Sequence, residues 1–103
     1  MVRALRPMYD GWLAPGSDVR CVLLSGSGEK AFCAGGDVAA VREEVLSGGT
    51  LPADFFYEEY ELNHKIATAH ERAGLVHVSV WDGVTMGGGV GLSLQVATLV
   101  ALL

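Results

Sequence analysis

Two short apolar runs, separated by a long stretch with helical periodicity, limit the fold that this chain can adopt. The first run is VRCVLLS, residues 19–25, and the second is LVHVSVW, residues 75–81. Each is bounded by turn residues, which is typical of a buried strand. Two helices are predicted between them, near residues 38–46 and 53–72. Because strands joined by helical crossovers pair in parallel, the sequence predicts an α/β fold in which these two strands are parallel and adjacent.

The longer of these helices places a carboxylate among apolar residues. Phe55, Glu59, Leu62 and Ile66 stand at i, i+4, i+7 and i+11, so they share one stripe of the helix. A carboxylate in an apolar stripe is costly unless something binds it. Glu59 is therefore either a functional residue or a residue at a solvated margin of the helix, and the spacing leaves both readings open.

The two ends of the chain are also predicted to be helical. Residues 2–13 form an amphipathic pattern interrupted by Pro7, with one side made of Ala4, Leu5, Met8 and Trp12. Residues 83–103 carry no charge for about 20 positions, the length of a membrane span. We expect a buried helix from Gly88 onward instead, with an inner face made of Leu92, Val96, Leu99 and Leu103.

Composition narrows the class of protein. A chain of 103 residues allows one domain at most, and 50% hydrophobic with 18% charged residues is typical of a globular protein. The net charge is −5 and the seven basic residues are scattered, which argues against a nucleic-acid partner.

Cysteine and histidine do not form a metal-ligand pattern. Cys21 and Cys33 are the only cysteines, and two cysteines make no metal set, so we expect two reduced, buried thiols. The histidines at 64, 70 and 77 are too irregularly spaced to share one helix face, so we expect them on the surface or on helices. No metal site is predicted.

Two glycine-rich loops each follow a predicted strand and open a helix. They are KAFCAGGDV at residues 30–38, where Asp37 is the expected N-cap, and TMGGGVGLS at residues 85–93. At such places backbone N–H groups are free, and two loops side by side would form a paired-amide site for an oxyanion. The alternative is that the glycines only allow positive φ and close packing. Neither loop matches a phosphate loop, a dinucleotide fingerprint or a nucleophile elbow.

Taken together, the motifs resemble the crotonase (enoyl-CoA hydratase/isomerase) superfamily. KAFCAGGDV, FFYEEYELNHKIAT and DGVTMGGGVGLS stand in that family's order and near its spacing, over residues 19–93. The resemblance implies a ClpP/crotonase-like parallel-sheet fold. It also implies that residues 1–103 are a partial enoyl-CoA hydratase/isomerase domain.

The resemblance assigns roles to particular residues. It implies that the backbone amides of Gly36 and Gly88 form an oxyanion hole for an acyl-CoA thioester. Lys30 and Ala34 would bind the substrate along its CoA arm, and Glu59 would line the acyl pocket and contact a 3-hydroxyl group. CoA is part of the substrate, so no cofactor is expected. The resemblance implies no particular oligomeric state.

Within the superfamily the pattern favours thioester hydrolysis. Hydratases place a catalytic glutamate two residues after the glycine triplet, and this chain has Gly91 there. The resemblance thus implies hydrolysis of 3-hydroxyisobutyryl-CoA in valine catabolism, in the mitochondrion or alternatively the peroxisome. A non-catalytic CoA-binding or structural fragment, or a hydratase/isomerase relative, remains an alternative.

The chain also departs from the family pattern. The family's first strands are absent, and so is the segment after Ser93 that carries its Pro-Glu-Thr loop and the acid/base glutamate and aspartate. We therefore expect a fragment whose own hydrolytic activity lies barely above background.

Overall fold

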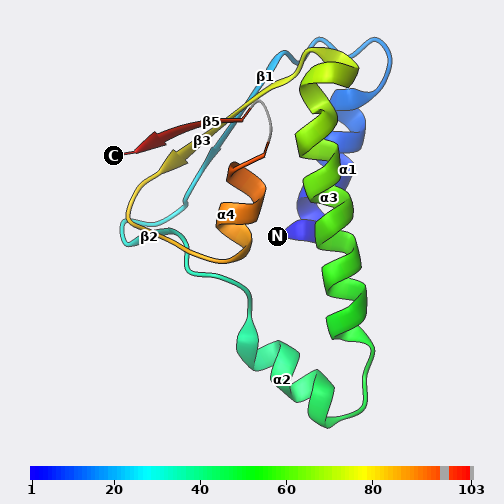
Figure 1. Cartoon of the computed structure of the whole chain (residues 1–103), viewed down its shortest axis with the longest axis vertical. Coiled ribbons are helices and arrows are strands. Elements are labelled where there is room, and N and C mark those ends of the chain that lie inside the picture. Colours follow the sequence, from blue (N-terminus) through cyan, green and yellow to red (C-terminus); the bar gives the residue numbers. More distant parts are fainter. Residues whose placement is uncertain (96–97, 103) are drawn as a thin grey trace.

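The computed structural model describes residues 1–95 and 98–102 as three parallel strands packed against helices (Figure 1). In chain order the elements are α1 (Val2–Leu13), β1 (Cys21–Ser25), β2 (Ala31–Cys33), α2 (Val38–Leu46), α3 (Leu51–Ala73), β3 (Val76–Trp81), β4 (Val84–Thr85), α4 (Gly88–Ser93) and β5 (Thr98–Leu102). The expected α/β class is confirmed.

The main sheet has the order β1-β3-β5, and both of its pairings are parallel. Val78 of the central strand pairs with Leu23 of β1 and with Leu99 of β5. The predicted adjacency of residues 19–25 and 75–81 is therefore confirmed. A second, two-stranded sheet pairs β2 with β4, also in parallel. We predicted a loop at 31–36, and β2 occupies its first half because its backbone finds β4 as a partner.

The prediction of one buried helix from Gly88 to the end of the chain is wrong. Helix α4 ends at Ser93, with Leu92 buried as expected, and residues 98–102 form β5. The periodicity of a short apolar run does not show whether the run forms a strand or a buried helix. The open edge of β3 supplies backbone hydrogen bonds that favour the strand. Val96 and Leu103, two members of the expected face, lie outside the described residues.

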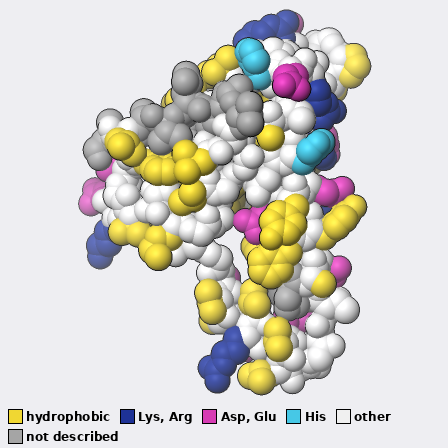
Figure 2. All heavy atoms as spheres, in the orientation of Figure 1, with side chains coloured by type: hydrophobic (Ala, Val, Ile, Leu, Met, Phe, Trp, Pro, Cys, Tyr) yellow, Lys and Arg dark blue, Asp and Glu magenta, His cyan; other side chains and the backbone are white. Residues whose placement is uncertain are grey.

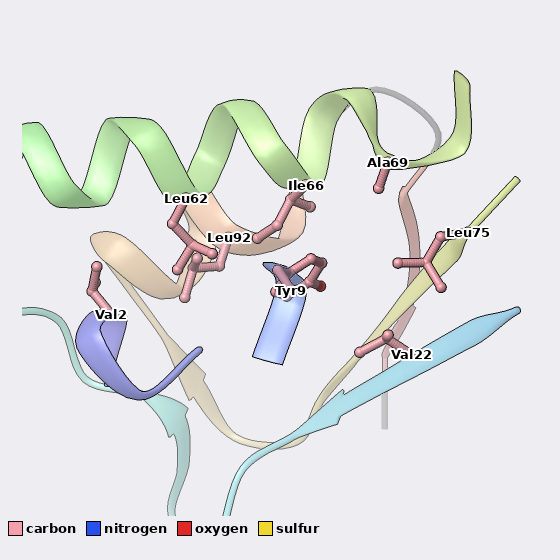
Figure 3. Close-up of a cluster of buried hydrophobic side chains, with 8 residues drawn as sticks. All are labelled: Val2, Tyr9, Val22, Leu62, Ile66, Ala69, Leu75 and Leu92. Atoms are coloured by element: carbon pink, nitrogen blue, oxygen red, sulfur yellow. The ribbon is translucent and has the colours of Figure 1, made fainter. Parts of the chain in front are cut away.

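The core lies between the sheet and the packed pair of helices α1 and α3 (Figure 3). Its buried members come from all of these layers and from α4: Val2, Tyr9, Val22, Leu62, Ile66, Ala69, Leu75 and Leu92. The predicted inner face of α1 is partly wrong. Tyr9 is buried whereas Met8 is 48% exposed, because the helix is rotated by about one residue from the expected stripe. The helix continues through Pro7.

Ion pairs hold the polar edges of α1 and α3 together. Arg3 Nε lies 2.8 Å from Glu58 Oε2, and Arg6 and Lys65 pair with Glu61 and Asp10 respectively. The guanidinium of Arg3 lowers the pKa of Glu58 by donating a hydrogen bond to it. All three pairs join the same two helices, so they fix how α1 is seated on α3.

One histidine and one cysteine depart from expectation. His64 and His70 are exposed on α3 as predicted, but His77 is buried on β3, where alternate residues face the helices. Cys33 is half-buried, whereas Cys21 is exposed on the outer side of the sheet rather than buried. Both thiols are free, and among the described residues no cluster of potential ligands could hold a metal ion. In the same described ranges, no helix has the length and apolar character needed to cross a bilayer.

His77 joins β3 to α1 through a buried hydrogen-bonded chain. The Tyr9 hydroxyl contacts His77 Nδ1, and His77 Nε2 lies 3.0 Å from Ser79 Oγ. A neutral ring with its hydrogen on Nε2 satisfies both contacts, with Tyr9 as donor to Nδ1. Burial lowers the pKa of His77 below its ordinary value of 6.5. Protonation of Nδ1 would remove the acceptor that Tyr9 uses.

This arrangement predicts that stability falls in mild acid. Below about pH 6.5 the unfolded chain binds a proton at His77 that the folded chain does not, so the free energy of unfolding rises with pH in this range. We expect full stability above about pH 6.5 and a decline of up to about 1.4 kcal/mol per pH unit below it. Urea unfolding between pH 7.5 and 5 measures this decline. His77→Gln should flatten the curve, and an equally steep curve in that variant would contradict the assignment.

Candidate functional site

The two glycine-rich loops meet at one end of the small sheet. Strands β2 and β4 run in parallel, and the Met86 N–H donates to the Cys33 carbonyl at 2.8 Å, so both loops leave the same edge. Gly35 and Gly87 have φ values of 108° and 57°, which glycine adopts without strain. A Cβ placed on Gly87 would lie 3.3 Å from Gly35 Cα and 4.0 Å from Gly36 N. The loops are therefore in contact, as the parallel topology predicts.

The backbone amides of Gly36 and Gly88 are unused at this junction. Within the described ranges, neither N–H donates a hydrogen bond to a backbone carbonyl. Gly88 is the first residue of α4, whose N–H has no intrahelical acceptor by geometry. Gly36 precedes Asp37, whose carboxylate caps α2 by accepting from Ala40 N at 3.0 Å, as predicted. Two free donors on touching loops can bind one oxygen atom that carries negative charge.

Glycine at 89 lets α4 approach β2 closely enough to hold the two loops together. Gly89 is buried, and a Cβ on it would lie 2.4 Å from Cys33 Cβ and 3.0 Å from Cys33 Sγ. Cys33 Cβ is fixed to the strand backbone, so the neighbour cannot move aside without shifting β2. Gly91 differs, because a Cβ there would lie 3.4 Å from its nearest neighbour, an ordinary contact.

We accordingly predict that Gly89→Ala destabilises the chain by about 1–3 kcal/mol, the usual cost of overpacking. Gly91→Ala is the matched control, two residues away on the same helix, and should leave stability unchanged or raise it by up to about 1 kcal/mol through helix propensity. Urea unfolding of both variants at neutral pH makes the comparison. Equal midpoints for the two variants would show that α4 does not pack on Cys33 in this way.

Glu59 reaches the same junction from α3. Its side chain is half-buried, and a Cβ on Gly88 would lie 2.9 Å from Glu59 Oε1. The carboxylate thus lies against the first residue of α4 and not on the outer, solvated side of α3. The apolar stripe left two readings of Glu59 open, and the structure places its side chain beside Gly88, one of the two residues to which the family resemblance assigns the oxyanion hole.

Lys30 and Ala34 flank β2 and are exposed. The Lys30 carbonyl accepts from Val84 N at 3.2 Å, which begins the β2–β4 pairing. Ala34 directly follows β2 and leads into the loop at Gly35 and Gly36. Both residues therefore lie along the chain that enters the glycine junction. Their expected contacts with the CoA arm stay a prediction.

One polar residue at this site escaped the sequence reasoning. Asn63 stands one turn after Glu59 on α3, and its Nδ2 lies 3.4 Å from the position of a Cβ on Gly91. Its Oδ1 is buried and accepts no hydrogen bond from any residue in the described part of the chain. Its i,i+4 spacing from Glu59 places the two side chains on one face of α3, but this spacing alone does not distinguish Asn63 from an exposed helix residue.

One surface hollow lies away from this junction. It measures about 350 Å³ and is lined by the outer side of α3: Tyr57, Tyr60, Glu61, His64, Lys65 and Arg72. Exposed hydrophobic side chains gather over this helix and over α2 in Figure 2. Neither glycine loop nor Glu59 lines the hollow, so it is separate from the glycine junction.

Comparison with known proteins shows the family to which this chain belongs. A family model described as enoyl-CoA hydratase/isomerase matches residues 1–102. Over 95 residues the chain is 44% identical to the mitochondrial 3-hydroxyisobutyryl-CoA hydrolase of Rattus norvegicus, covering 92% of this chain and 23% of that protein. It is also 44% identical, over 99 residues, to the small ribosomal subunit protein mS47 of Neurospora crassa, covering 92% and 18%. The chain thus spans less than a quarter of the length of these relatives.

Two solved structures are similar to this chain in fold. An enoyl-CoA hydratase from Rhodobacter sphaeroides 2.4.1 superposes with a TM-score of 0.81 and 31% identity, covering 99% of this chain and 31% of that one. A carnitinyl-CoA dehydratase from Mycobacterium thermoresistibile gives a TM-score of 0.75 and 38% identity, covering 89% and 26%. The predicted crotonase-like fold is confirmed by these two structures.

Proposed function

Because the chain belongs to the enoyl-CoA hydratase/isomerase family, we propose that it is part of an acyl-CoA thioester hydrolase acting on 3-hydroxyisobutyryl-CoA. The products would be 3-hydroxyisobutyrate and CoA, as in valine catabolism. The observation that carries the proposal is the contact between two loops whose Gly36 and Gly88 amides are unused. The name of the relative from Rattus norvegicus supports the choice of substrate.

The two amides would act on the thioester carbonyl. Water attacks the carbonyl carbon, and the carbonyl oxygen becomes an oxyanion that accepts hydrogen bonds from Gly36 N–H and Gly88 N–H. The C–S bond then breaks, and CoA leaves as a thiolate that takes up a proton. The family resemblance assigns the base that activates water to a downstream segment that these 103 residues do not include. Residues 1–103 would therefore supply the oxyanion hole and part of the acyl pocket.

Gly91 favours hydrolysis over hydration. A hydratase of this family would carry a glutamate at this position, and here the position has no side chain. Glu59 is then the carboxylate beside the acyl group, where it would accept a hydrogen bond from the 3-hydroxyl. Lys30 and Ala34 would follow the CoA arm, and no further cofactor is required.

A chimera tests the proposed function. We would replace the 95 aligned residues of the Rattus norvegicus relative with this chain and measure free-CoA release from 3-hydroxyisobutyryl-CoA. We expect hydrolysis, and no hydration of a 2-enoyl-CoA offered as the alternative substrate. Hydration without thioester cleavage would instead support the hydratase alternative.

A folded but inactive chimera would support a non-catalytic role. That alternative has one specific observation in its favour, the similarity to a protein named for the small ribosomal subunit.

The names of the hydrolase relatives support a mitochondrial location for the proposed hydrolase, and they give no support to a peroxisomal one.

A further inference from the structure

Two polar side chains of α3 face two glycines of α4. Glu59 and Asn63 are four residues apart and share one face of α3, while Gly88 and Gly91 are three apart and share one face of α4. Glu59 Oε1 lies 2.9 Å from a Cβ placed on Gly88, and Asn63 Nδ2 lies 3.4 Å from a Cβ placed on Gly91. The two helices pack together, and the buried side chains of Leu62 from α3 and Leu92 from α4 lie close to each other (Figure 3). We call Glu59, Asn63, Gly88 and Gly91 the polar strip.

Asn63 sits in this strip without a partner for its oxygen. Oδ1 is buried and accepts no hydrogen bond within the described residues. A buried polar atom without a partner destabilises the free protein, and such atoms in native structures call for an explanation. An apolar side chain of the same shape would fill this place at lower cost, so the amide itself is the feature to be explained.

We propose that the side-chain amide of Asn63 binds the hydroxyl group of the acyl chain and so sets a preference for hydroxyacyl over plain acyl thioesters. This inference rests on the proposed function. A hydroxyl offers one hydrogen and accepts through its oxygen, whereas the Glu59 carboxylate can only accept. Asn63 supplies the donor that Glu59 lacks, because half a turn of its amide brings Nδ2 to the buried position now held by the unpartnered Oδ1, from where it can donate to the hydroxyl oxygen.

The distances along the helices fit the length of such a ligand. Gly88, whose amide would hold the thioester oxygen, and Gly91 are separated by slightly less than one helical turn, which rises about 5.4 Å. The 3-hydroxyl of an acyl thioester lies two carbon atoms from the carbonyl. A carbonyl oxygen at Gly88 would therefore place the hydroxyl within reach of Glu59 and Asn63.

The test compares two ligands that differ only in the hydroxyl. Calorimetric titration of the 103-residue chain with 3-hydroxyisobutyryl-CoA and isobutyryl-CoA gives a ratio of dissociation constants. We expect the wild type to favour the hydroxylated ligand about tenfold, the effect of one or two net hydrogen bonds. Asn63→Leu, an apolar side chain of similar shape, should reduce the preference to less than about twofold, while isobutyryl-CoA binds as before. His64→Ala, at the exposed neighbouring position, should keep the full preference.

The stability of Asn63 variants shows whether Asn63 serves ligand binding or the fold. If Asn63 serves the ligand, Asn63→Leu should unfold at an equal or higher urea concentration than the wild type, whereas loss of a structural residue would lower it. Asn63→Ala serves as the second variant if the leucine does not fold. An unchanged preference in the Asn63 variants overturns the inference and leaves the proposed function standing. No binding of either acyl-CoA to the wild type overturns the proposed function, and the inference with it.

Discussion

Replacing Gly88 with proline is expected to lower kcat for 3-hydroxyisobutyryl-CoA hydrolysis by the chimera about 10²–10³-fold, the usual effect of removing one oxyanion-hole donor. Proline has no N–H, so the substitution deletes the donor. Gly88 is the first residue of α4, and the first position of a helix is the one that tolerates proline best. The donor matters mainly in the transition state, so KM should change far less than kcat.

Gly88→Ala is the matched control for this prediction. It keeps the N–H but adds a Cβ close to Glu59 Oε1, which lies at the free end of a side chain and can move. The difference in kcat between Gly88→Pro and Gly88→Ala isolates the hydrogen bond from the steric effect. Equal losses in the two variants would show that crowding near Glu59, and not the amide, controls the rate.

The second large effect is expected from the isolated chain. It contains Gly36, Gly88 and Glu59, but the acid/base residues that the family resemblance assigns downstream are not among its 103 residues. General acid–base catalysis contributes about 10²–10⁴-fold, so the purified chain should fall short of the chimera by at least that factor. Free-CoA release measured on both proteins at equal concentration tests this. Comparable turnover would place the catalytic base within this chain, and Glu59→Gln would then be the variant to examine.

The parts of the fold that were predicted correctly are those with strong local patterns. The apolar runs at 19–25 and 75–81 have turn residues on both sides, and they became β1 and β3. Asp37 signals the start of α2, and the long stripe of α3 is unambiguous because it extends over several turns. Parallel pairing followed from the helices between the strands and needed no knowledge of tertiary contacts.

The elements that were missed depend on partners distant in the sequence. Strands β2 and β4 are only three and two residues long, and each exists because the other is there to pair with. Residues 98–102 became a strand because β3 had a free edge. His77 was expected on the surface or on a helix, yet it lies on β3, whose pleat turns it toward α1, where Tyr9 supplies a hydrogen bond. None of these contacts leaves a periodic signal in the local sequence.

The candidate site was also predicted only in part. The residues alone singled out the two glycine loops and the carboxylate of Glu59, and the family resemblance then assigned the roles of Gly36, Gly88 and Glu59. The structure brings the two loops and the carboxylate to one junction. Asn63 was missed because an asparagine on a helix is unremarkable until the packing shows that its oxygen is buried without a partner. A residue of this kind can be identified only when the facing element, here α4, is in place.

Amide NMR of the ¹⁵N-labelled chain tests the central claim, that Gly36 and Gly88 together bind the thioester oxygen. The spectrum would be followed during titration with 3-hydroxyisobutyryl-CoA and, separately, with free CoA, which lacks the carbonyl. We expect the Gly36 and Gly88 amide protons to move downfield with the thioester and to move far less with CoA. If both amides keep their positions while resonances elsewhere respond to the thioester, the carbonyl binds at another place and the proposed oxyanion hole is wrong.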